Sequence, residues 1–217
     1  MRFIFEQVQL GGDKNLGYLI GDRDQGEAAI IDPSYDPDRL IDRAAAQGME
    51  VRYIINTHSH HDHVNGNDAA KAVTGAKVVA YHESAIPYDI GVQDKDELMV
   101  GTWKLQFLHT PGHCPDHLVI YNPDFQVAIT GDILFVGKVG ITRSVENATT
   151  EWHSLQRILK ELPPESTVWP GHDYGCRPSS TLAMEAATNA FLCCKDLDEF
   201  LALKSVWKEV RREKGIL

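Results

Sequence analysis

A histidine-rich segment constrains the fold of this chain more than any other feature. Four of the ten histidines lie in residues 57–63, which read THSHHDH. The segment follows a predicted buried strand over residues 51–56 and precedes a predicted helix over residues 66–73. Imidazole and carboxylate groups together are typical ligands of zinc, iron or manganese. The pattern therefore favours a metal site at a strand end over a solvated polar loop.

The spacing within this segment predicts how its side chains are directed. Side chains of an extended chain alternate between two faces. On that basis His58, His60 and Asp62 point to one side, whereas His63 points away. The turn into the following helix then presents these groups to two neighbouring centres.

Three later segments also end predicted strands with a ligand-type residue beside a glycine. They are residues 109–113 (HTPGH), 130–132 (TGD) and 169–174 (WPGHDY). Glycine allows the backbone to turn sharply and to approach a bound ion closely. Each segment alone is weak evidence, but in this order after the histidine-rich segment they indicate one common site.

The remaining pattern predicts two packed sheets with helices outside them. Strands and helices are interspersed without the strict alternation of a parallel doubly wound sheet. The predicted strands cover residues 2–9, 15–21, 28–31, 77–80, 105–108, 118–121, 127–130 and 168–169. The predicted helices cover residues 37–47, 151–161, 179–190 and 196–213.

Composition places the chain among globular proteins and excludes some partners. The 217 residues are 43% hydrophobic and 24% charged, with a net charge of −10. The acidic balance argues against binding to nucleic acid or to an anionic membrane surface. We find no apolar run long enough to span a bilayer, no signal peptide and no disulfide framework, and therefore expect a cytoplasmic protein. We expect one domain over residues 1–217, with C-terminal helices at about 179–213 packed on it, and a homodimer is a further hypothesis.

The four segments together identify a family resemblance. The spacing H-x-H-x-D-H over residues 58–63, followed by His113, Asp132 and His172, resembles the metallo-β-lactamase-fold hydrolase superfamily, in particular its glyoxalase II and persulfide dioxygenase branch. The resemblance covers nearly the whole chain and fills all seven ligand positions. It implies an α+β fold, a four-layer αββα sandwich with the site at one edge of the sheets. By this analogy one metal is held by His58, His60 and His113, a second by Asp62, His63 and His172, and Asp132 bridges them.

The resemblance implies hydrolysis by two divalent metal ions, with zinc favoured and iron or manganese as alternatives. A hydroxide held between two such ions attacks a carbonyl carbon. Asp62 is the catalytic candidate, because it is placed to orient the bridging oxygen and to shuttle its proton. A thiolate leaving group needs no strong general acid, since thiols ionise near pH ~8.5. We therefore favour a thioesterase of the glyoxalase II (hydroxyacylglutathione hydrolase-like) type, acting on a small molecule such as a thiol conjugate.

The same residues leave other activities open. Persulfide dioxygenases of this branch use one Fe(II), held by the equivalents of His58, His113 and Asp132, and that set leaves positions for oxygen and substrate. Asp173, directly after His172, resembles their pattern more than that of glyoxalase II. A lactonase and a non-catalytic metal-binding domain are less favoured hypotheses.

Substrate contacts are predicted from the loop after Asp132 and from residues near His172. Glyoxalase II enzymes carry Gly-Cys-Gly and a basic residue in this loop, whereas Val139 and Ile141 stand at the cysteine and basic positions here. Lys138, Arg143 and Tyr174 are the candidate substrate-binding residues. The last predicted helix carries basic residues that are candidates to attract an anionic substrate tail: Lys204, Lys208, Arg211, Arg212 and Lys214.

Four further residues near the motifs receive structural interpretations. We expect His61 to be exposed and His109 to be a hydrogen-bonded structural group. Cys114 is expected to be a small buried thiol, and His117 an ordinary histidine.

Overall fold

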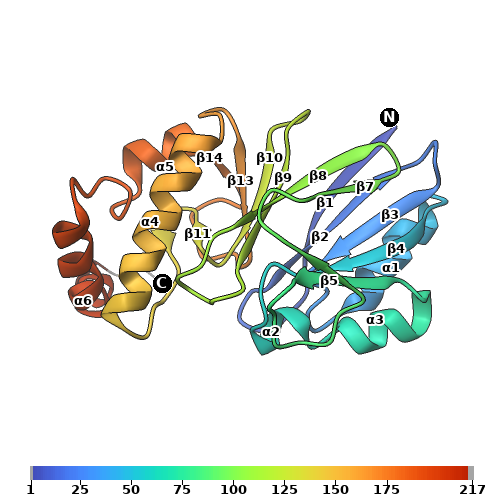
Figure 1. Ribbon diagram of the computed structural model, residues 1–217, viewed down its shortest axis with the longest axis horizontal. Coiled ribbons are helices and arrows are strands. Elements are labelled where there is room, and N and C mark those ends of the chain that lie inside the picture. The colour runs from blue at the N-terminus through green and yellow to red at the C-terminus, as the bar shows by residue number, and fades with distance from the viewer. Residues whose placement is uncertain (1, 215–217) are drawn as a thin grey trace.

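The computed structural model describes residues 2–214, apart from the side chains at positions 208 and 211–214. Its first half forms a six-stranded sheet of β1 (Phe3–Gln9), β2 (Leu16–Asp22), β3 (Glu27–Ile31), β4 (Glu50–Ile55), β5 (Lys77–Tyr81) and β6 (Ile90–Val92). The strands lie in chain order, with β1 to β3 antiparallel and β3 to β6 parallel. The helices α1 (Pro37–Ala46) and α3 (Asn67–Thr74) flank this sheet, and α2 (His61–Val64) lies at its edge (Figure 1).

The second half forms another six-stranded sheet, in the order β14-β13-β10-β9-β8-β7. Its strands are β7 (Glu97–Val100), β8 (Trp103–His109), β9 (Leu118–Asn122), β10 (Val127–Gly131), β13 (Thr167–Pro170) and β14 (Ser180–Thr181). The short strands β11 (Leu134–Phe135) and β12 (Lys138–Val139) form a separate ribbon. The helices α4 (Val145–Glu161), α5 (Leu182–Thr188) and α6 (Leu197–Lys214) lie on the side away from the first sheet (Figure 1).

Three hydrophobic clusters hold the layers together, and strand alternation distributes residues among them. On β3, Ile30 packs toward Leu40 of α1, whereas its neighbour Ile31 packs toward Phe107 in the second sheet. On the far side, Val119 of the second sheet belongs to a cluster with Leu155 of α4. Each sheet is therefore covered by helices on one face and by the other sheet on the opposite face. The predicted four-layer αββα sandwich is confirmed.

Element boundaries differ from the predictions mainly at helix starts. The helix predicted from residue 151 begins at Val145, because the Ser144 side chain accepts the backbone N–H of Asn147 and caps it there. The helix predicted over residues 179–190 covers only Leu182–Thr188, since residues 180 and 181 pair with β13 and Thr181 caps the helix. The sequence analysis missed α2 and five strands of two to four residues, which are too short for a periodic pattern.

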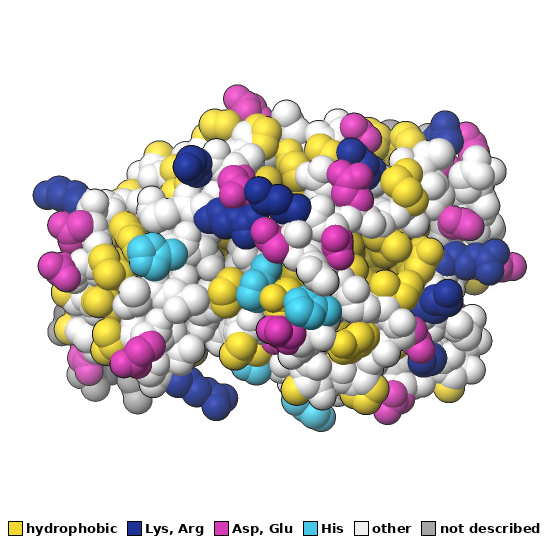
Figure 2. Space-filling model, in the orientation of Figure 1, with side chains coloured by type: hydrophobic (Ala, Val, Ile, Leu, Met, Phe, Trp, Pro, Cys, Tyr) yellow, Lys and Arg dark blue, Asp and Glu magenta, His cyan; other side chains and the backbone are white. Residues whose placement is uncertain are grey.

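The charged surface and the cysteines are consistent with the composition. On the face shown in Figure 2, basic side chains stand beside acidic ones rather than forming one continuous basic region. Within residues 2–214 no helix is long and apolar enough to cross a bilayer. The four cysteines are free thiols.

A buried ion pair attaches α6 to α4. The Glu151 carboxylate is fully buried and contacts the Lys204 ammonium, whose side chain is 12% exposed. Burial raises the pKa of Glu151 to about 7, although the Lys204 charge acts in the opposite direction. Lys204 Nζ also donates a hydrogen bond to the Gly140 carbonyl at 2.5 Å. This pair therefore fixes both the last helix and the loop after β12.

We expect Lys204→Met to lower the free energy of unfolding by about 3 kcal/mol at pH 7.5, because it leaves a buried carboxylate without a partner. Lys204→Met combined with Glu151→Leu should recover most of that loss, since an apolar pair fills the same space. Urea denaturation of both variants measures this. A double variant as unstable as the single one would contradict the explanation.

The same experiment has a pH signature. The pKa of Glu151 stands above its ordinary value of 4.5 in the folded protein, so the folded state binds the proton more strongly between pH 4.5 and about 7. The contribution of this group to stability therefore falls as the pH rises through that window. The double variant lacks the group and should gain stability relative to the wild type over the same window.

Candidate metal centre

The seven residues predicted as ligands lie together at one edge of the two sheets. His58 and His60 follow β4, and Asp62 and His63 lie in α2. His113 lies in the loop between β8 and β9, Asp132 directly after β10, and His172 after β13. The strand ends thus bring together residues that are more than 100 positions apart in the sequence.

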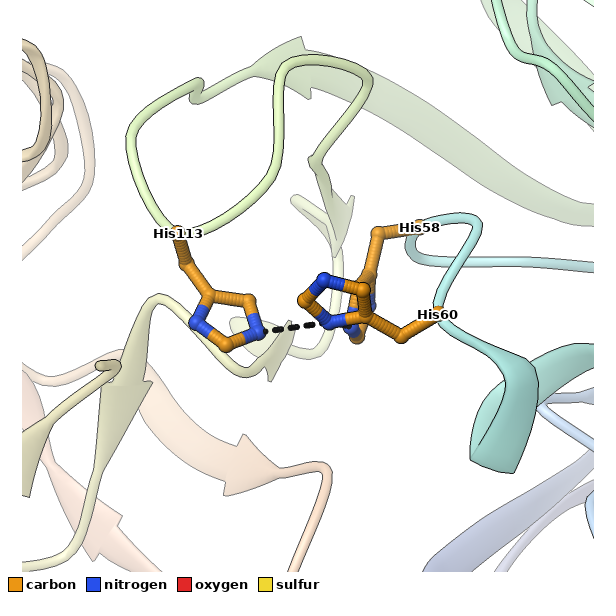
Figure 3. A group of neighbouring side chains, drawn as sticks. All are labelled: His58, His60 and His113. Carbon is orange, nitrogen blue, oxygen red and sulfur yellow. Dashed lines mark hydrogen bonds between the residues drawn. The ribbon is translucent and has the colours of Figure 1, made fainter. Parts of the chain in front are cut away.

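The first group of donor atoms comes from His58, His60 and His113. Figure 3 shows His60 facing His113 across a short gap, with His58 beside them. His60 Nδ1 lies 3.0 Å from His58 Nε2 and 2.9 Å from His113 Nε2. All three donor atoms lie within 4.8 Å of one another, which is close enough to share one metal ion.

The second group comes from Asp62, His63 and His172, and Asp132 lies between the two groups. His63 Nε2 lies 3.2 Å from His172 Nε2, and Asp62 Oδ2 lies 3.4 Å from the same His172 atom. The two oxygens of Asp132 lie 3.3 to 3.5 Å from the inner nitrogens of His63, His113 and His172. Asp132 thus approaches both groups on the side of the inner nitrogens, whereas Asp32, which lies near His58 and His63, meets His63 at its outer Nδ1.

Hydrogen bonds to the outer nitrogens of the histidine rings determine whether the inner nitrogens carry a proton or a lone pair. His113 Nδ1 bonds to the Ile141 carbonyl at 2.9 Å, and His172 Nδ1 bonds to the Asp13 carbonyl at 2.8 Å. A carbonyl oxygen only accepts, so both Nδ1 atoms carry the proton. In the neutral ring the opposite Nε2 then carries a lone pair directed at the centre.

The same argument extends to His58 and His63 through Asp32 and Thr57. Asp32 Oδ2 accepts from the Thr57 hydroxyl at 2.6 Å and from His63 Nδ1 at 2.9 Å. Since the Thr57 proton goes to Asp32, its oxygen accepts from His58 Nδ1 at 3.0 Å. His58 Nε2 and His63 Nε2 are therefore the lone-pair nitrogens of their neutral rings.

This donor set fits divalent cations of the zinc and iron type. Several imidazole nitrogens and the carboxylates of Asp62 and Asp132 converge within a few ångströms, an arrangement that repels itself unless a positive charge lies between the donors. Asp132 Oδ1 is buried and accepts no hydrogen bond from the described residues. Burial alone would lower the pKa of His63. The negative charges of Asp132 and Asp32 raise it by more than burial lowers it, so the pKa of His63 stands well above its ordinary value. A proton on His63 thus balances part of the negative charge, and metal binding displaces it.

Two glycines allow the close approach of backbone and ligands. A Cβ atom on Gly171 would lie 2.3 Å from Asp132 Oδ1, so only glycine fits before His172. Gly131 has a positive φ of 48°, which favours glycine, and it turns the chain so that Asp132 faces the centre. Gly131 and Gly171 therefore allow the candidate ligands that follow them to approach one another closely.

The sequence analysis missed three residues that orient the candidate ligands. Asp32 holds His63, as described above, and Asn15 Nδ2 donates to both the backbone oxygen and Oδ2 of Asp62 at 3.0 Å. His117 Nε2 accepts the backbone N–H of Asp132 at 3.1 Å, and burial lowers the pKa of His117 to about 3, so its ring stays neutral. The expectation that His117 is ordinary is wrong. Of the three, only Asp32 stood in a recognisable sequence pattern, the Asp32-Pro33 pair at the end of β3.

Of the other predictions near the motifs, those for His61, Cys114 and His109 are confirmed and the one for the direction of Asp62 is wrong. The strict alternation of side chains holds for His58 and His60 but is wrong for Asp62, because the helical turn of α2 brings it beside His63 and His172. His61 is exposed as predicted, and Cys114 is a buried thiol. His109 is a hydrogen-bonded structural residue as predicted, since its Nε2 bonds to the Pro115 carbonyl.

A cavity of about 1000 Å³ opens beside the centre, and the three candidate substrate residues line it. Tyr174 stacks on His172 with ring centroids 4.7 Å apart and donates to Asp13 Oδ2 at 2.5 Å. Lys138 Nζ lies 3.7 Å from the centroid of the Tyr174 ring. Arg143 is exposed on the cavity wall, and Lys204 also lines it. The side chains of the other four basic residues predicted along the last helix lie outside the described part of the chain.

Fold and site together define a metal-binding αββα protein, and a family comparison specifies the class. Residues 10–172 match the family model described as the metallo-beta-lactamase superfamily. The chain therefore belongs to the metallo-β-lactamase superfamily.

Individual relatives fall into the two groups that the sequence suggested. A hydroxyacylglutathione hydrolase of Maricaulis maris is 40% identical over 164 residues, which are 74% of this chain and 62% of that protein. The human mitochondrial persulfide dioxygenase ETHE1 is 30% identical over 192 residues, 87% of this chain and 74% of that protein. The crystal structure of ETHE1 from Myxococcus xanthus has a TM-score of 0.86 at 33% identity, covering 93% of this chain and 90% of that one. This chain thus spans less than two thirds of the Maricaulis protein.

We expect Asp32→Asn to weaken metal binding about 10- to 100-fold, because an amide no longer accepts the proton of His63 Nδ1 in the same way and the ring loses its orientation. Competition with a chromophoric chelator measures the affinity. Asp42→Asn is the matched control, since Asp42 is an exposed aspartate on α1. Equal affinity of Asp32→Asn and the control would show that Asp32 does not orient a ligand.

Proposed function

We propose that this chain is a metal-dependent hydrolase of small-molecule thioesters, of the glyoxalase II type. One observation carries the proposal: two groups of three donor residues adjoin each other, and the Asp132 carboxylate lies between them. Such an arrangement suits two cations a few ångströms apart. The hydroxyacylglutathione hydrolase among the relatives supports a thioester as the substrate.

The proposed ligands follow the two groups. His58, His60 and His113 hold one metal ion, and Asp62, His63 and His172 hold the other, with Asp132 as the shared ligand. Zinc is the favoured metal, with iron or manganese as alternatives, because nitrogen and carboxylate donors suit all three. When bound, these ions supply Lewis acidity toward a carbonyl and lower the pKa of water.

Asp62 is the proposed catalytic residue of the chain itself. Its Oδ2 is held by Asn15 and faces His172, while its backbone oxygen is fixed by Asn15 and by the Ser34 hydroxyl at 2.6 Å. Burial raises its pKa, but the hydrogen bond from Asn15 and the neighbouring His63 and His172 lower it below the ordinary value. The half-buried carboxylate therefore stays ionised near neutral pH, where it can orient a water molecule by accepting its hydrogen bond.

The substrate residues are assigned from the cavity wall. Lys138 and Arg143 offer positive charge to an anionic thiol conjugate, and Tyr174 forms an aromatic surface against His172. No strong general acid is required beside the centre, since a thiolate leaves without protonation at neutral pH.

A second candidate function is a persulfide dioxygenase that uses one Fe(II) held by His58, His113 and Asp132. The similarity to ETHE1 of Myxococcus xanthus favours it, because that similarity extends over nearly the full length of both chains. Two histidines and one carboxylate leave open positions for oxygen and substrate on a single iron. The two candidates differ in how many metal ions the same side chains hold.

Metal content and substrate together distinguish the two candidates. For the hydrolase we expect about two metal ions per chain by elemental mass spectrometry, with release of thiol from S-lactoylglutathione. About one iron per chain, with oxygen uptake on glutathione persulfide and no thioester hydrolysis, would replace the proposal by the dioxygenase. Protein purified without chelators and under anaerobic conditions is used for both assays.

Replacement of the shared carboxylate tests the arrangement itself. Asp132→Ala should lower metal affinity and thioester hydrolysis by more than about 100-fold, because both ions lose a ligand, whereas loss of an outer partner lowers them by up to about 100-fold. His61→Ala is the matched control from the same motif, since His61 is exposed and outside both groups. Full metal occupancy and activity in Asp132→Ala would refute the assignment, as would a large metal loss in the control.

A further inference from the structure

The cavity beside the candidate metal centre is lined by both charged and apolar side chains. Lys14, Lys138, Arg143 and Lys204 contribute positive charge and Asp13 and Asp132 negative charge, in a protein whose net charge is −10. The apolar wall of the cavity comes from the loop after β12, from the start of α4 and from α6. Its residues are Val139, Ile141, Val145, Ala148, Leu201 and Trp207.

Contacts of α6 with neighbouring elements hold the apolar wall in place. Trp207 packs edge-on against the buried Phe191, with ring centroids 4.7 Å apart. The ion pair of Lys204 with Glu151 fixes α6 against α4, and the bond from Lys204 to the Gly140 carbonyl fixes the loop. The wall therefore keeps its shape without a ligand.

Two residues of this wall stand exposed at its rim. The side chain of Ile141 is 74% exposed and that of Val145 is 63% exposed. Isolated exposed aliphatic residues are ordinary, but these two line the same cavity as the half-buried Leu201 and Trp207. A ligand lying in this cavity would remove apolar surface from water.

The wall also leads directly to the metal centre. His113 and Asp132 line the same cavity, and the Ile141 carbonyl accepts the hydrogen bond from His113 Nδ1. At about 1000 Å³ the cavity is at the upper end of the range for small-molecule sites, and it has room for a chain of several carbon atoms beside a charged group.

We infer that the substrate is a thioester that joins an apolar acyl chain of several carbons to an anionic thiol. The acyl chain lies on the apolar wall of α4, α6 and the loop, and the thiol portion faces Lys14, Lys138 and Arg143. In a thioester the acyl group is the part that varies in apolar length, whereas a water-soluble thiol carrier owes its solubility to charged groups. This inference rests on the proposed thioester hydrolysis and specifies its substrate class.

Binding can be measured separately from hydrolysis. S-Hexylglutathione and S-methylglutathione are thioethers, so the metal-loaded enzyme does not hydrolyse them. Calorimetric titration should give a dissociation constant for the hexyl compound at least ~10-fold lower, because a fully buried methylene strengthens binding about 4-fold. Equal binding of the two compounds would overturn the inference whatever the enzyme hydrolyses.

Hydrolysis should show the same preference. For acetyl, butanoyl and hexanoyl thioesters of glutathione we expect kcat/KM to rise by up to about 4-fold per added methylene. A flat or falling series with measurable turnover would overturn the inference and leave the proposed function standing. Hydrolysis of no thioester at all, while S-hexylglutathione still binds preferentially, would instead reject the proposed function.

Matched variants locate the effect on the apolar wall. Ile141→Ser combined with Val145→Ser should lower the hexanoyl-to-acetyl ratio of kcat/KM several-fold, and it retains the Ile141 carbonyl that His113 uses. Val73→Ser is the control, since Val73 is 66% exposed on α3 and does not line the cavity. An unchanged ratio would overturn the inference. If sedimentation also shows that the wild type is a dimer and that this double variant dissociates, the wall would be assigned to contact with a second copy of the chain instead.

Discussion

The carbonyl groups of Ile141 and Asp13 can only accept hydrogen bonds, so the histidine nitrogens that face them carry the proton and leave a lone pair on the inner side. Asp32 imposes the same orientation on His63 and, through the Thr57 hydroxyl, on His58. These outer hydrogen bonds turn a group of neutral imidazoles into a converging donor set. Without them each ring would be free to exchange its tautomer, and the centre would lose its fixed affinity for a cation.

The same outer contacts connect the centre to the two halves of the sandwich. Asp32 ends β3 of the first sheet and adopts a positive φ of 47°, a strained conformation that its hydrogen bonds to Thr57 and His63 compensate. Gly131 at the end of β10 and His117 just before β9 set the direction of Asp132. The metal centre therefore forms at one common edge of the two sheets, which pack face to face, and its geometry depends on the shared hydrophobic core between them.

The last helix has a second role beside packing. Its ion pair with α4 and its bond to Gly140 hold the loop whose next carbonyl, that of Ile141, orients His113. The wall of the cavity and the orientation of one candidate ligand thus depend on the same few contacts. The helix α6 therefore borders the cavity and, through the loop at Gly140, supports one candidate metal ligand.

Local sequence predicted two packed sheets with helices outside them and most of the longer strands, because period-two hydrophobicity and glycine turns are properties of neighbouring residues. The family resemblance of the four motifs implied the four-layer αββα arrangement and the seven candidate ligands. Local sequence did not reveal Asp32, Asn15 or His117 as orienting groups, since an isolated polar residue at a strand end has no pattern of its own. Nor did it show that Asp62 joins His63 and His172, because the four residues of α2 are too few to give a helical period. The contacts from Asp13 to His172 and from Lys204 to Gly140 join residues 159 and 64 positions apart. Only the tertiary structure decided these contacts, because packing of the sheets and of the last helix, rather than local preference, brings such residues within hydrogen-bond distance.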